Sequence, residues 1–480
     1  MGDELRKIHK ASVRILSEIG IRLHHPEILE LLQTKGIRVE GKTAYFEDKQ
    51  LKHWVNMAPG RFSLTARNPE YEMFIGGDKL EYAAGYGAAC IVDAQGNRRS
   101  ARIEDYLKFL QLVHQSRYFN LNGGLLVQPM DLMGIPGIPL MLYATILYSD
   151  KCLMGMQSNA RTMEQIMDMV AIIFGGKDKL LEQPRILTMI STLSPLQIDR
   201  DALDSMLICS RYRQPMIFSP GPSAGTTGPI TIAGNISLAN AEALAGIAIS
   251  QMIRPGTPVI YGLQSTVADM QSGSVSTASP AYSIQSTYCA RLARMYGIPS
   301  RTGGTNNDAK GVSVQSGYES MFTMLNACLN GVNLVVHSAG MLDSYAATSY
   351  EQFIVDLEII SMIEFYLQGI EIDEDSFAFE VIKEVGSGGQ FLTTEHTLQR
   401  CRTESWSPMI GLRGALAGIS PNDQFLYNIE KSMDKMLKSY VRPTLDAQVH
   451  QNLQAYLKDE VGIESKWLEQ VDGDSLTETA

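Results

Sequence analysis

The sequence is poor in charge and has no excess of basic residues. Only 19% of its 480 residues are Asp, Glu, Lys or Arg, and 41 basic residues stand against 52 acidic ones, a net charge of −11. Proteins bind polyanions through Lys and Arg side chains that displace counterions, and no basic stripe is present to do so. We therefore expect no nucleic-acid partner. Hydrophobic residues make up 45% of the chain, enough for a large buried core.

Long hydrophobic runs are also missing. The most apolar stretch, residues 134–148, is shorter than the roughly 20 residues that cross a bilayer, and it contains Pro136 and Pro139. The first 20 residues mix both charge signs at helical spacing and lack the apolar centre and cleavage site of a signal peptide. The sequence therefore predicts a cytoplasmic protein without a membrane span.

Cysteine pairs and metal-binding motifs are sparse. The six cysteines are scattered without a CxxC pair, and no HxH or HExxH motif occurs. Closely spaced thiols or imidazoles form most zinc sites, and regularly spaced cysteines form disulfide frameworks. We expect reduced thiols and no bound metal.

The first hundred residues read as an α+β appendage. Apolar residues recur at three- and four-residue steps over residues 3–34 and are interrupted at His24-His25-Pro26, which predicts two helices. Residues 39–93 alternate short β-prone runs with Gly, Asn and Pro, as antiparallel hairpins do. We place the boundary of the appendage at residue 100, because a regular helix begins at Arg102.

From there, seven short apolar runs alternate with segments long enough for crossover helices, which is typical of parallel strands. An eighth strand at Ile370-Glu371-Ile372, after a helix over 352–367, would complete a (β/α)8 TIM barrel spanning residues 101–375. A doubly wound open sheet is the alternative. Residues 376–480 are expected to form a helical extension packed on the barrel. The seven predicted strands are 119–127, 152–156, 185–190, 215–218, 258–262, 298–301 and 333–337.

A barrel binds its ligands where the strands end, and here those segments are neutral, polar and rich in glycine. They offer no carboxylate pair for glycoside hydrolysis and no lysine for a Schiff base. Turn geometry alone explains the glycines, but they would also allow a large planar ligand, or another protein's cofactor, to approach the backbone closely. The glycines in question are Gly221, Gly225, Gly228, Gly303 and Gly304.

Two tyrosines and a histidine lie in predicted loops next to small residues. Tyr86 stands in AAGYGAAC, and His337 and Tyr345 stand in HSAGMLDSY. An aromatic face within about 6 Å of a quaternary ammonium group attracts it by roughly 0.5–2 kcal/mol. These tyrosines are candidates for such a cation-binding box. The alternatives are that each tyrosine caps a hydrophobic patch and that His337 is a hydrogen-bonded core residue.

Three separated motifs resemble the trimethylamine methyltransferase superfamily. They are RTGGTNNDAKGVSVQSGYESMFTMLNACLNGVN from Arg301, HSAGMLDSYAATSYEQFIVDLEII from His337 and GSGGQFLTTEHTLQRCRTESWSP from Gly386. The resemblance extends from the N-terminal helices to about Pro408. Enzymes of this superfamily pass a methyl group from a methylated amine to the cobalt of a corrinoid protein.

The trimethylamine enzymes carry pyrrolysine near the segment that follows AGML, where this chain has Asp343-Ser344-Tyr345. The chain therefore resembles the branch that lacks pyrrolysine, whose members demethylate quaternary amines such as glycine betaine, proline betaine and carnitine. A quaternary nitrogen leaves as a neutral tertiary amine, so attack by Co(I) needs no general acid and no pyrrolysine. In such a reaction the main contribution of the protein is to position the substrate and the methyl acceptor.

The resemblance implies that three residues line the pocket, Tyr86, His337 and Tyr345, and three more are candidates from their places at the predicted strand ends. Tyr86 and Tyr345 would face the ammonium group, and His337 would hydrogen-bond the substrate carboxylate. Arg301 would be the charged anchor of that carboxylate, unless it forms a structural ion pair. Gln264 and Asn306, at the ends of the fifth and sixth predicted strands, would be further polar contacts.

The resemblance also implies a partner. The DxHxxG signature of cobalamin binding does not occur in the sequence, so the corrinoid would arrive on a separate protein that docks over the barrel mouth. The glycine-rich loops at 221–228 and 303–304 would form part of its platform, in an anaerobic cytoplasm. Two alternatives are a metal-dependent methyltransferase with another acceptor and a non-catalytic betaine-binding sensor or scaffold. The apolar content and the 24 methionines are compatible with a homo-oligomer.

Overall fold

The computed structural model describes residues 2–415, 418 and 420–473. Its N-terminal part contains the two expected opening helices, α1 (Gly2–Arg14, continued by η1, Ile15–Ile19) and α2 (Pro26–Thr34), followed by α3 (Asp48–Val55). These helices surround a small sheet with the strand order β12-β1-β3-β2. The sheet ties the appendage to the rest of the chain, because β12 comes from a loop that follows a barrel strand. Its strands are β1 (Ile21–Leu23), β2 (Arg38–Glu40), β3 (Thr43–Tyr45) and β12 (Gln197–Ile198).

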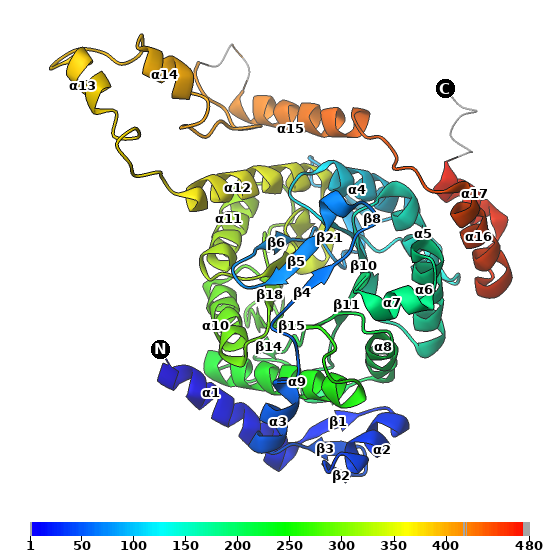
Figure 1. The fold of residues 1–480 in the computed structure, drawn as a ribbon. Helices are drawn as coiled ribbons and strands as arrows, with labels where there is room; N and C mark the ends of the chain where they lie inside the picture. The colour runs from blue at the N-terminus through cyan, green and yellow to red at the C-terminus, as the bar shows by residue number, and fades with distance from the viewer. Residues whose placement is uncertain (1, 416–417, 419, 474–480) are drawn as a thin grey trace.

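Eight parallel strands form a closed barrel at the centre of the molecule (Figure 1). Their order is β6-β19-β18-β15-β13-β11-β10-β9, and a bridge between Tyr82 and Phe119 closes the ring. This closure confirms the (β/α)8 fold and rules out the open sheet. The strands are β6 (Glu81–Tyr82), β9 (Leu121–Gly123), β10 (Cys152–Met156), β11 (Ile186–Ile190), β13 (Met216–Phe218), β15 (Val259–Gly262), β18 (Ser300–Gly303) and β19 (Leu334–Val336).

The prediction for the eighth strand was wrong. Ile370 and Ile372 are 83% and 72% exposed and form no strand. The place is taken by β6, which pairs with β19 through Leu334 and Val335. The barrel sheet therefore takes in a strand from the segment assigned to the appendage, before residue 100.

A ring of helices covers the outside of the barrel (Figure 1). One of them, α9, is long and apolar enough to cross a membrane, but 83% of its most apolar window is buried inside the protein. It packs against α1, α3 and the strands, so its apolarity is that of a core helix. The helices are α4 (Ile103–Gln115), α5 (Gly137–Tyr148), α6 (Ala160–Phe174), α7 (Lys177–Glu182), α8 (Arg200–Arg211), α9 (Ile232–Ile253), α10 (Pro280–Tyr296), α11 (Val314–Leu329) and α12 (Tyr350–Gln368).

A hairpin of β4 (Arg61–Leu64) and β5 (Met73–Gly76) seals the amino-terminal end of the barrel. Phe62, Leu64, Met73 and Ile75 of the hairpin share one buried cluster with side chains inside the barrel. Cys152, the first residue of β10, donates its thiol hydrogen to the Leu64 carbonyl at 3.1 Å. The hairpin therefore fills the barrel interior from its amino-terminal end, and the carboxyl ends of the strands form the open side.

Short elements decorate the open side and the outer surface. Near the strand ends lie β7 (Cys90–Val92), β8 (Arg98–Ser100), β14 (Ser223–Ala224), β16 (Thr266–Ala268), β17 (Val275–Ser276), β20 (Met341–Leu342) and β21 (Ala347–Thr348), with the 3-10 turns η3 (Met130–Leu132) and η4 (Asp343–Tyr345); η2 (Pro69–Tyr71) lies in the sealing hairpin. After α12 the chain forms α13 (Phe379–Val385), α14 (Glu395–Arg400), α15 (Pro421–Lys438), α16 (Ala447–Tyr456), η5 (Leu457–Val461) and α17 (Ser465–Asp472). Of these, α15 packs on α12 and α4, and α16 and α17 pack on α6 and α5.

Candidate active site

A buried arginine lies at the centre of the strand ends. Arg301 belongs to β18 and has no exposed surface. Its Nη1 donates to Ser219 Oγ at 3.0 Å and to the side-chain oxygen of Gln264, and its Nη2 donates to Nδ1 of His337 at 3.2 Å. Among the described residues, no Asp or Glu contacts this guanidinium. A buried charge without a partner is costly, so the site is prepared for an anion from outside.

His337 follows β19 and is 5% exposed. Because arginine can only donate, Nδ1 must accept its hydrogen bond, and Nε2 must carry the proton that it donates to the Tyr86 carbonyl at 3.2 Å. Burial, with Arg301 as a second cause, lowers the pKa of His337 well below its usual range. The imidazole is therefore neutral at pH 7. Its backbone lies in the left-handed region at φ 57°, a strain that is common in residues of functional sites.

The two predicted tyrosines both lie next to this histidine. The ring of Tyr86 meets that of His337 edge-on at 6.5 Å between centroids, and the ring of Tyr345 lies 4.4 Å from it at 33°. The Tyr345 hydroxyl also forms a hydrogen bond with the Gln264 amide. The structure thus brings together five of the six predicted contacts: Tyr86, Gln264, Arg301, His337 and Tyr345.

Tyr345 is held in place by an unusual turn. Asp343, Ser344 and Tyr345 all have left-handed backbones, at φ 52°, 51° and 76°, which costs an L-residue roughly 1–2 kcal/mol each. The Asp343 carboxylate pairs with Arg98 and Lys310. Its pKa is low despite burial because of these two cations. The surrounding contacts therefore stabilise a conformation that the sequence alone would not adopt.

The loop after β18 supplies the other contacts of this turn. The Ser344 hydroxyl donates to Asp308 Oδ1 at 2.7 Å, and the backbone N–H of Ser344 donates to the Asn307 carbonyl at 3.1 Å. Asp308 also accepts hydrogen bonds from Ser276 and Thr277 of the neighbouring loop. One carboxylate thus links two loops over the strand ends.

Asn306 is buried beside the same cluster with an unsatisfied amide. Neither its Oδ1 nor its Nδ2 has a hydrogen-bond partner among the described residues. Gly303 lies between this amide and Tyr282: a Cβ atom on Gly303 would lie 2.5 Å from Asn306 Nδ2 and from the Tyr282 hydroxyl, which accepts a hydrogen bond from the Gly303 N–H at 3.0 Å. Buried amides are rarely left unpaired without a reason, so Asn306 is available to a ligand.

Sequence reasoning missed one residue of this site, Tyr282, and did not single out another, Ser219, among the residues that follow the predicted strands. Tyr282 lies in the first turn of α10, where the segment was interpreted only as a crossover helix, and Ser219 directly follows β13. Burial raises the pKa of the Tyr282 hydroxyl, so it stays protonated at neutral pH. An aromatic residue just after a helix N-cap at the open end of the barrel was the signal that could have revealed Tyr282.

The expected role of two glycines as a surface platform was wrong. Gly303 and Gly304 are buried. A Cβ atom on Gly303 would lie 2.5 Å from the Tyr282 hydroxyl, and one on Gly304 would lie 2.7 Å from the Val335 side chain. These glycines allow the Tyr282 and Val335 side chains to pack closely against the backbone. Gly221, Gly225 and Gly228 are at least partly exposed on the loop after β13.

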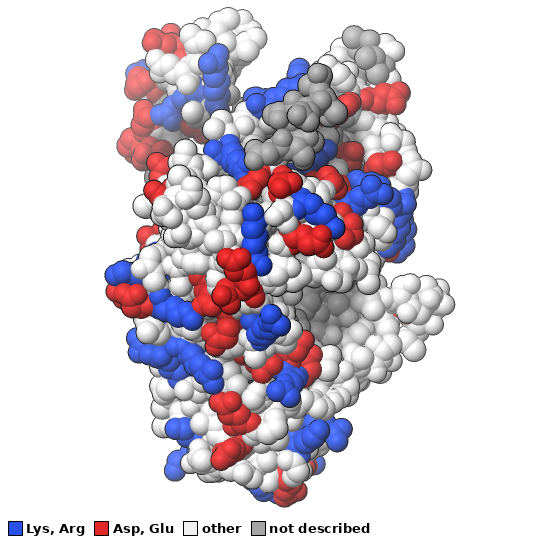
Figure 2. Space-filling view, turned by 90° about the vertical axis from the view of Figure 1, so that its right-hand side faces the viewer, with Lys and Arg blue, Asp and Glu red and all other residues white. Residues whose placement is uncertain are grey.

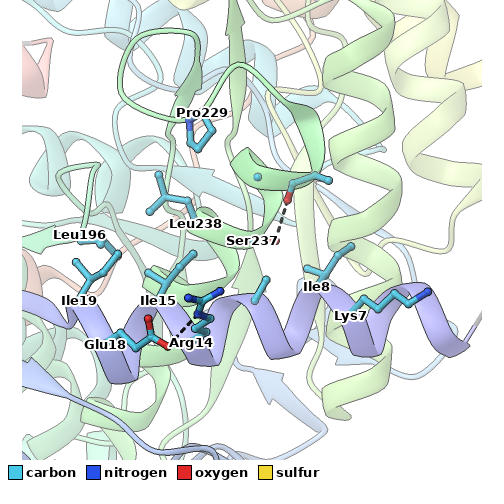
Figure 3. Close-up of a pocket in the computed structure, with 13 residues that line it drawn as sticks. Lys7, Ile8, Arg14, Ile15, Glu18, Ile19, Leu196, Pro229, Ser237 and Leu238 are labelled. Carbon is cyan, nitrogen blue, oxygen red and sulfur yellow. Dashed lines mark hydrogen bonds and ion pairs between the residues drawn. The ribbon is translucent and has the colours of Figure 1, made fainter.

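Two cavities bear on where ligands enter. A pocket of about 420 Å³ opens at the carboxyl ends of β9–β11 and reaches Tyr86; Gln128, Met156, Gln157 and Met189 also line it. A larger groove of about 680 Å³ lies between α1 and α9 (Figure 3). The polar groups in that groove bind each other: Arg14 pairs with Glu18 at 2.9 Å, and Ser237 donates to the Ala233 carbonyl at 2.8 Å. Arg14, Glu18 and Ser237 are thus already engaged within the protein.

No metal centre is apparent in the described ranges 2–415, 418 and 420–473. They contain no group of three or more His, Cys, Asp or Glu side chains placed to hold a metal ion. The six cysteines are all free thiols, and four of them are buried.

A family model described as trimethylamine methyltransferase (MTTB) matches residues 1–461. The chain belongs to this family. Its relatives include the glycine betaine methyltransferase of Desulfitobacterium hafniense strain Y51, which is 41% identical over 457 residues, 95% of each chain. The trimethylamine methyltransferase MttB of strain DCB-2 is 29% identical over 418 residues, covering 85% of this chain and 82% of that one.

A solved structure supports the fold of this MTTB-family protein. The monomethylamine methyltransferase MtmB of Methanosarcina barkeri superposes with a TM-score of 0.54 at 12% identity, covering 92% of this chain and 88% of that one. At this identity the likeness concerns the fold alone, a (β/α)8 barrel with additional helices.

Proposed function

We propose that this protein is an enzyme that removes a methyl group from a quaternary amine bearing a carboxylate, such as glycine betaine, proline betaine or carnitine. The acceptor in this proposal is the Co(I) of a corrinoid protein. One observation carries the proposal: the buried Arg301 guanidinium has no acidic partner among the described residues. The 41% identity to a glycine betaine methyltransferase supports the same class of substrate.

Arg301 is the proposed anchor of the substrate carboxylate. A guanidinium binds a carboxylate through two parallel hydrogen bonds, and in the free protein one of its N–H groups is occupied by the Gln264 amide. We propose that the carboxylate displaces the Gln264 oxygen. The amide of Asn306, which has no hydrogen-bond partner among the described residues, is the proposed donor for a second oxygen atom.

We propose that tyrosine rings bind the ammonium group. Burial raises the pKa values of Tyr86, Tyr282 and Tyr345, so each stays neutral and presents an electron-rich face without a competing negative charge. Each ring close to the cation contributes about 0.5–2 kcal/mol. His337 is neutral and fixes the Tyr86 backbone, so its role in the proposal is to position the box.

The reaction needs no proton from the protein. A bound corrinoid supplies the Co(I) electron pair that takes the methyl carbon, while the C–N electron pair stays on nitrogen and a neutral tertiary amine leaves. Arg301, His337 and the tyrosines then have only to bind the substrate, orient the N–CH3 bond towards the mouth and exclude water.

The rim of the barrel mouth fits a docking protein that brings the corrinoid. Four loops, after β9, β11, β13 and β15, each present an exposed apolar side chain. Exposed apolar residues grouped around a site are typical of interaction surfaces. They are Met133 (73% exposed), Leu193 (49%), Ile230 (57%) and Met270 (71%). The six free thiols agree with the reducing cytoplasm in which we place this reaction.

The test is anaerobic demethylation by the full-length protein. Reduced cobalamin is mixed with glycine betaine, proline betaine, carnitine, choline or trimethylamine, and the loss of Co(I) absorbance and the demethylated amine are both measured. We expect turnover with a carboxylated quaternary amine and none with choline or trimethylamine. Calorimetric binding of a betaine without turnover, even with a corrinoid protein present, would refute the enzyme and support a binding protein.

A further inference from the structure

A long segment of the chain leaves the barrel and forms no core of its own. Residues 369–408, here called the arm, leave α12 at Gln368 and contain α13 and α14. In Figure 1 the arm projects at the upper left, outside the ring of barrel helices. The chain returns at Met409–Gly411, whose three N–H groups donate to the Glu358 carboxylate of α12. Within the described part of the chain, the arm is thus tied to the barrel near its two ends.

The arm is uncovered and exposes apolar side chains among its charged ones. No residue from 364 to 409 is buried, although this stretch contains α13 and α14. Ordering a segment of this length costs conformational entropy, and the segment offsets that cost only if it buries apolar surface. Its exposed apolar side chains are Ile370, Ile372, Phe377, Phe379, Ile382, Phe391, Leu392 and Leu398, between 44% and 83% exposed.

A second uncovered apolar surface lies on the neighbouring barrel helices. On α11, Val314, Tyr318 and Phe322 recur every four residues and therefore share one face, and Glu319 is the single charged residue of this helix. The C-terminal end of α12 adds Met362, Phe365, Tyr366 and Leu367. We call this surface the α11–α12 face. The opposite side of the molecule, in contrast, carries charges of both signs (Figure 2).

We propose that the arm of one copy of this chain packs on the α11–α12 face of a second copy. Each copy has one arm and one α11–α12 face. In a dimer with twofold symmetry, each arm therefore packs on the face of the other copy, and both arms and both faces become buried. The corrinoid partner is not the occupant in this proposal, because the arm and the face lie on the flank of the barrel and not over its open end (Figure 1).

The available area suffices for a stable dimer. Seven aromatic side chains of the two surfaces are between 38% and 67% exposed: Tyr318, Phe322, Phe365, Tyr366, Phe377, Phe379 and Phe391. At about 150–250 Å² per fully buried ring, they alone offer roughly 700 Å² per copy. A standard interface buries about 800 Å² per partner, and the aliphatic residues add to the aromatic share.

The test is the mass of the full-length protein in solution, measured by light scattering during size exclusion. We expect twice the chain mass of 52.9 kDa. Phe379→Asp with Leu392→Asp on the arm, and Tyr318→Asp with Phe322→Asp on the face, should each abolish the dimer while circular dichroism stays unchanged. Leu181→Asp, at a 41% exposed site on α7, is the matched control and should remain dimeric.

Mixing the variants tests the pairing itself. An arm variant still has an intact face, and a face variant still has an intact arm, so the mixture should contain a heterodimer held by one of the two contacts. A wild-type protein that stays at the monomer mass at every concentration would overturn the proposal. So would a dimer that survives both double variants.

Discussion

Nη2 of Arg301 lies 3.2 Å from Nδ1 of His337, and both side chains are buried. This contact fixes the histidine tautomer, and Nε2 then holds the Tyr86 carbonyl at 3.2 Å. A residue of β18 thereby positions the loop that carries an aromatic ring of the proposed cation box. In the proposed binding mode, one imidazole therefore links the binding of the two ends of the zwitterionic substrate.

Replacing Arg301 should abolish recognition of the carboxylate. Removing one partner of a buried charge pair costs about 2–5 kcal/mol, so we expect Arg301→Gln to weaken betaine binding by about 30-fold or more. The betaine affinity of Arg301→Lys should lie between those of the wild type and Arg301→Gln, because lysine keeps the charge and lacks the planar guanidinium. Calorimetry measures both, and Ser219→Ala, which removes one neutral contact of Arg301, is the control. Unchanged betaine affinity in Arg301→Gln would contradict the proposed anchor.

His337 should make the protein sensitive to acid. Its folded pKa is well below the unfolded value of about 6.5, so its contribution to stability is complete above pH 6.5 and is lost as the pH falls towards the folded pKa. Thermal unfolding between pH 5 and 8 should show a steeper loss in the wild type than in His337→Gln, by up to about 1.4 kcal/mol per pH unit. Glutamine preserves one acceptor and one donor. The exposed His53→Gln variant should retain the wild-type slope; equal slopes in all three proteins would disprove the assignment.

The turn that carries Tyr345 should depend on Asp343. Asp343→Ala removes the ion pairs with Arg98 and Lys310 that stabilise three left-handed residues. We expect betaine affinity to fall by about 5- to 30-fold, equivalent to about 1–2 kcal/mol, because Tyr345 is no longer held against His337. Glu380→Ala removes an exposed ion pair on the arm and serves as the control. If Asp343→Ala bound substrate normally, this turn would have no positioning role.

Apolar residues at the rim should matter for the corrinoid protein and not for the amine. We expect Ile230→Asp combined with Met270→Asp to raise the KM for the corrinoid protein at least about tenfold, a loss of roughly 1.4 kcal/mol. Calorimetric affinity for the amine should not change. Val441→Asp, 76% exposed on the C-terminal extension, is the comparison. A rim variant with wild-type KM would place the docking surface elsewhere.

Much of the barrel was predictable because its strands are short apolar runs between long helices. Strand β10 matches its predicted bounds, and β11, β13 and β15 differ by a single residue at their starts. The strand β6 was missed because two residues, Glu81 and Tyr82, carry no periodicity, and their partner β19 lies some 250 residues away in the sequence. The pairing of β6 with β19 becomes visible only in the closed barrel.

The site was predictable to the extent that its residues follow strands. His337 and Gln264 follow β19 and β15 and were found by that rule. Arg301 was found because the predicted strand 298–301 ends at it, although β18 extends from Ser300 to Gly303 and contains it. Tyr86 and Tyr345 were found by their small neighbours and the family motif. Tyr282 was missed because it reaches the site from a helix. Gly303 and Gly304 were misassigned because a glycine required for internal packing looks the same in sequence as a glycine on a surface loop.

Among the described residues, the β4–β5 hairpin closes the amino-terminal end of the barrel and leaves the carboxyl ends of the strands as the entrance. In the proposed reaction, the amine and the methyl acceptor must then pass through the same opening, and the acceptor is a whole protein that covers it. The kinetics should accordingly follow a compulsory order, in which the amine binds before the corrinoid protein and its demethylated product departs after that protein has left. An excess of corrinoid protein should inhibit the enzyme by closing the entrance on an empty site.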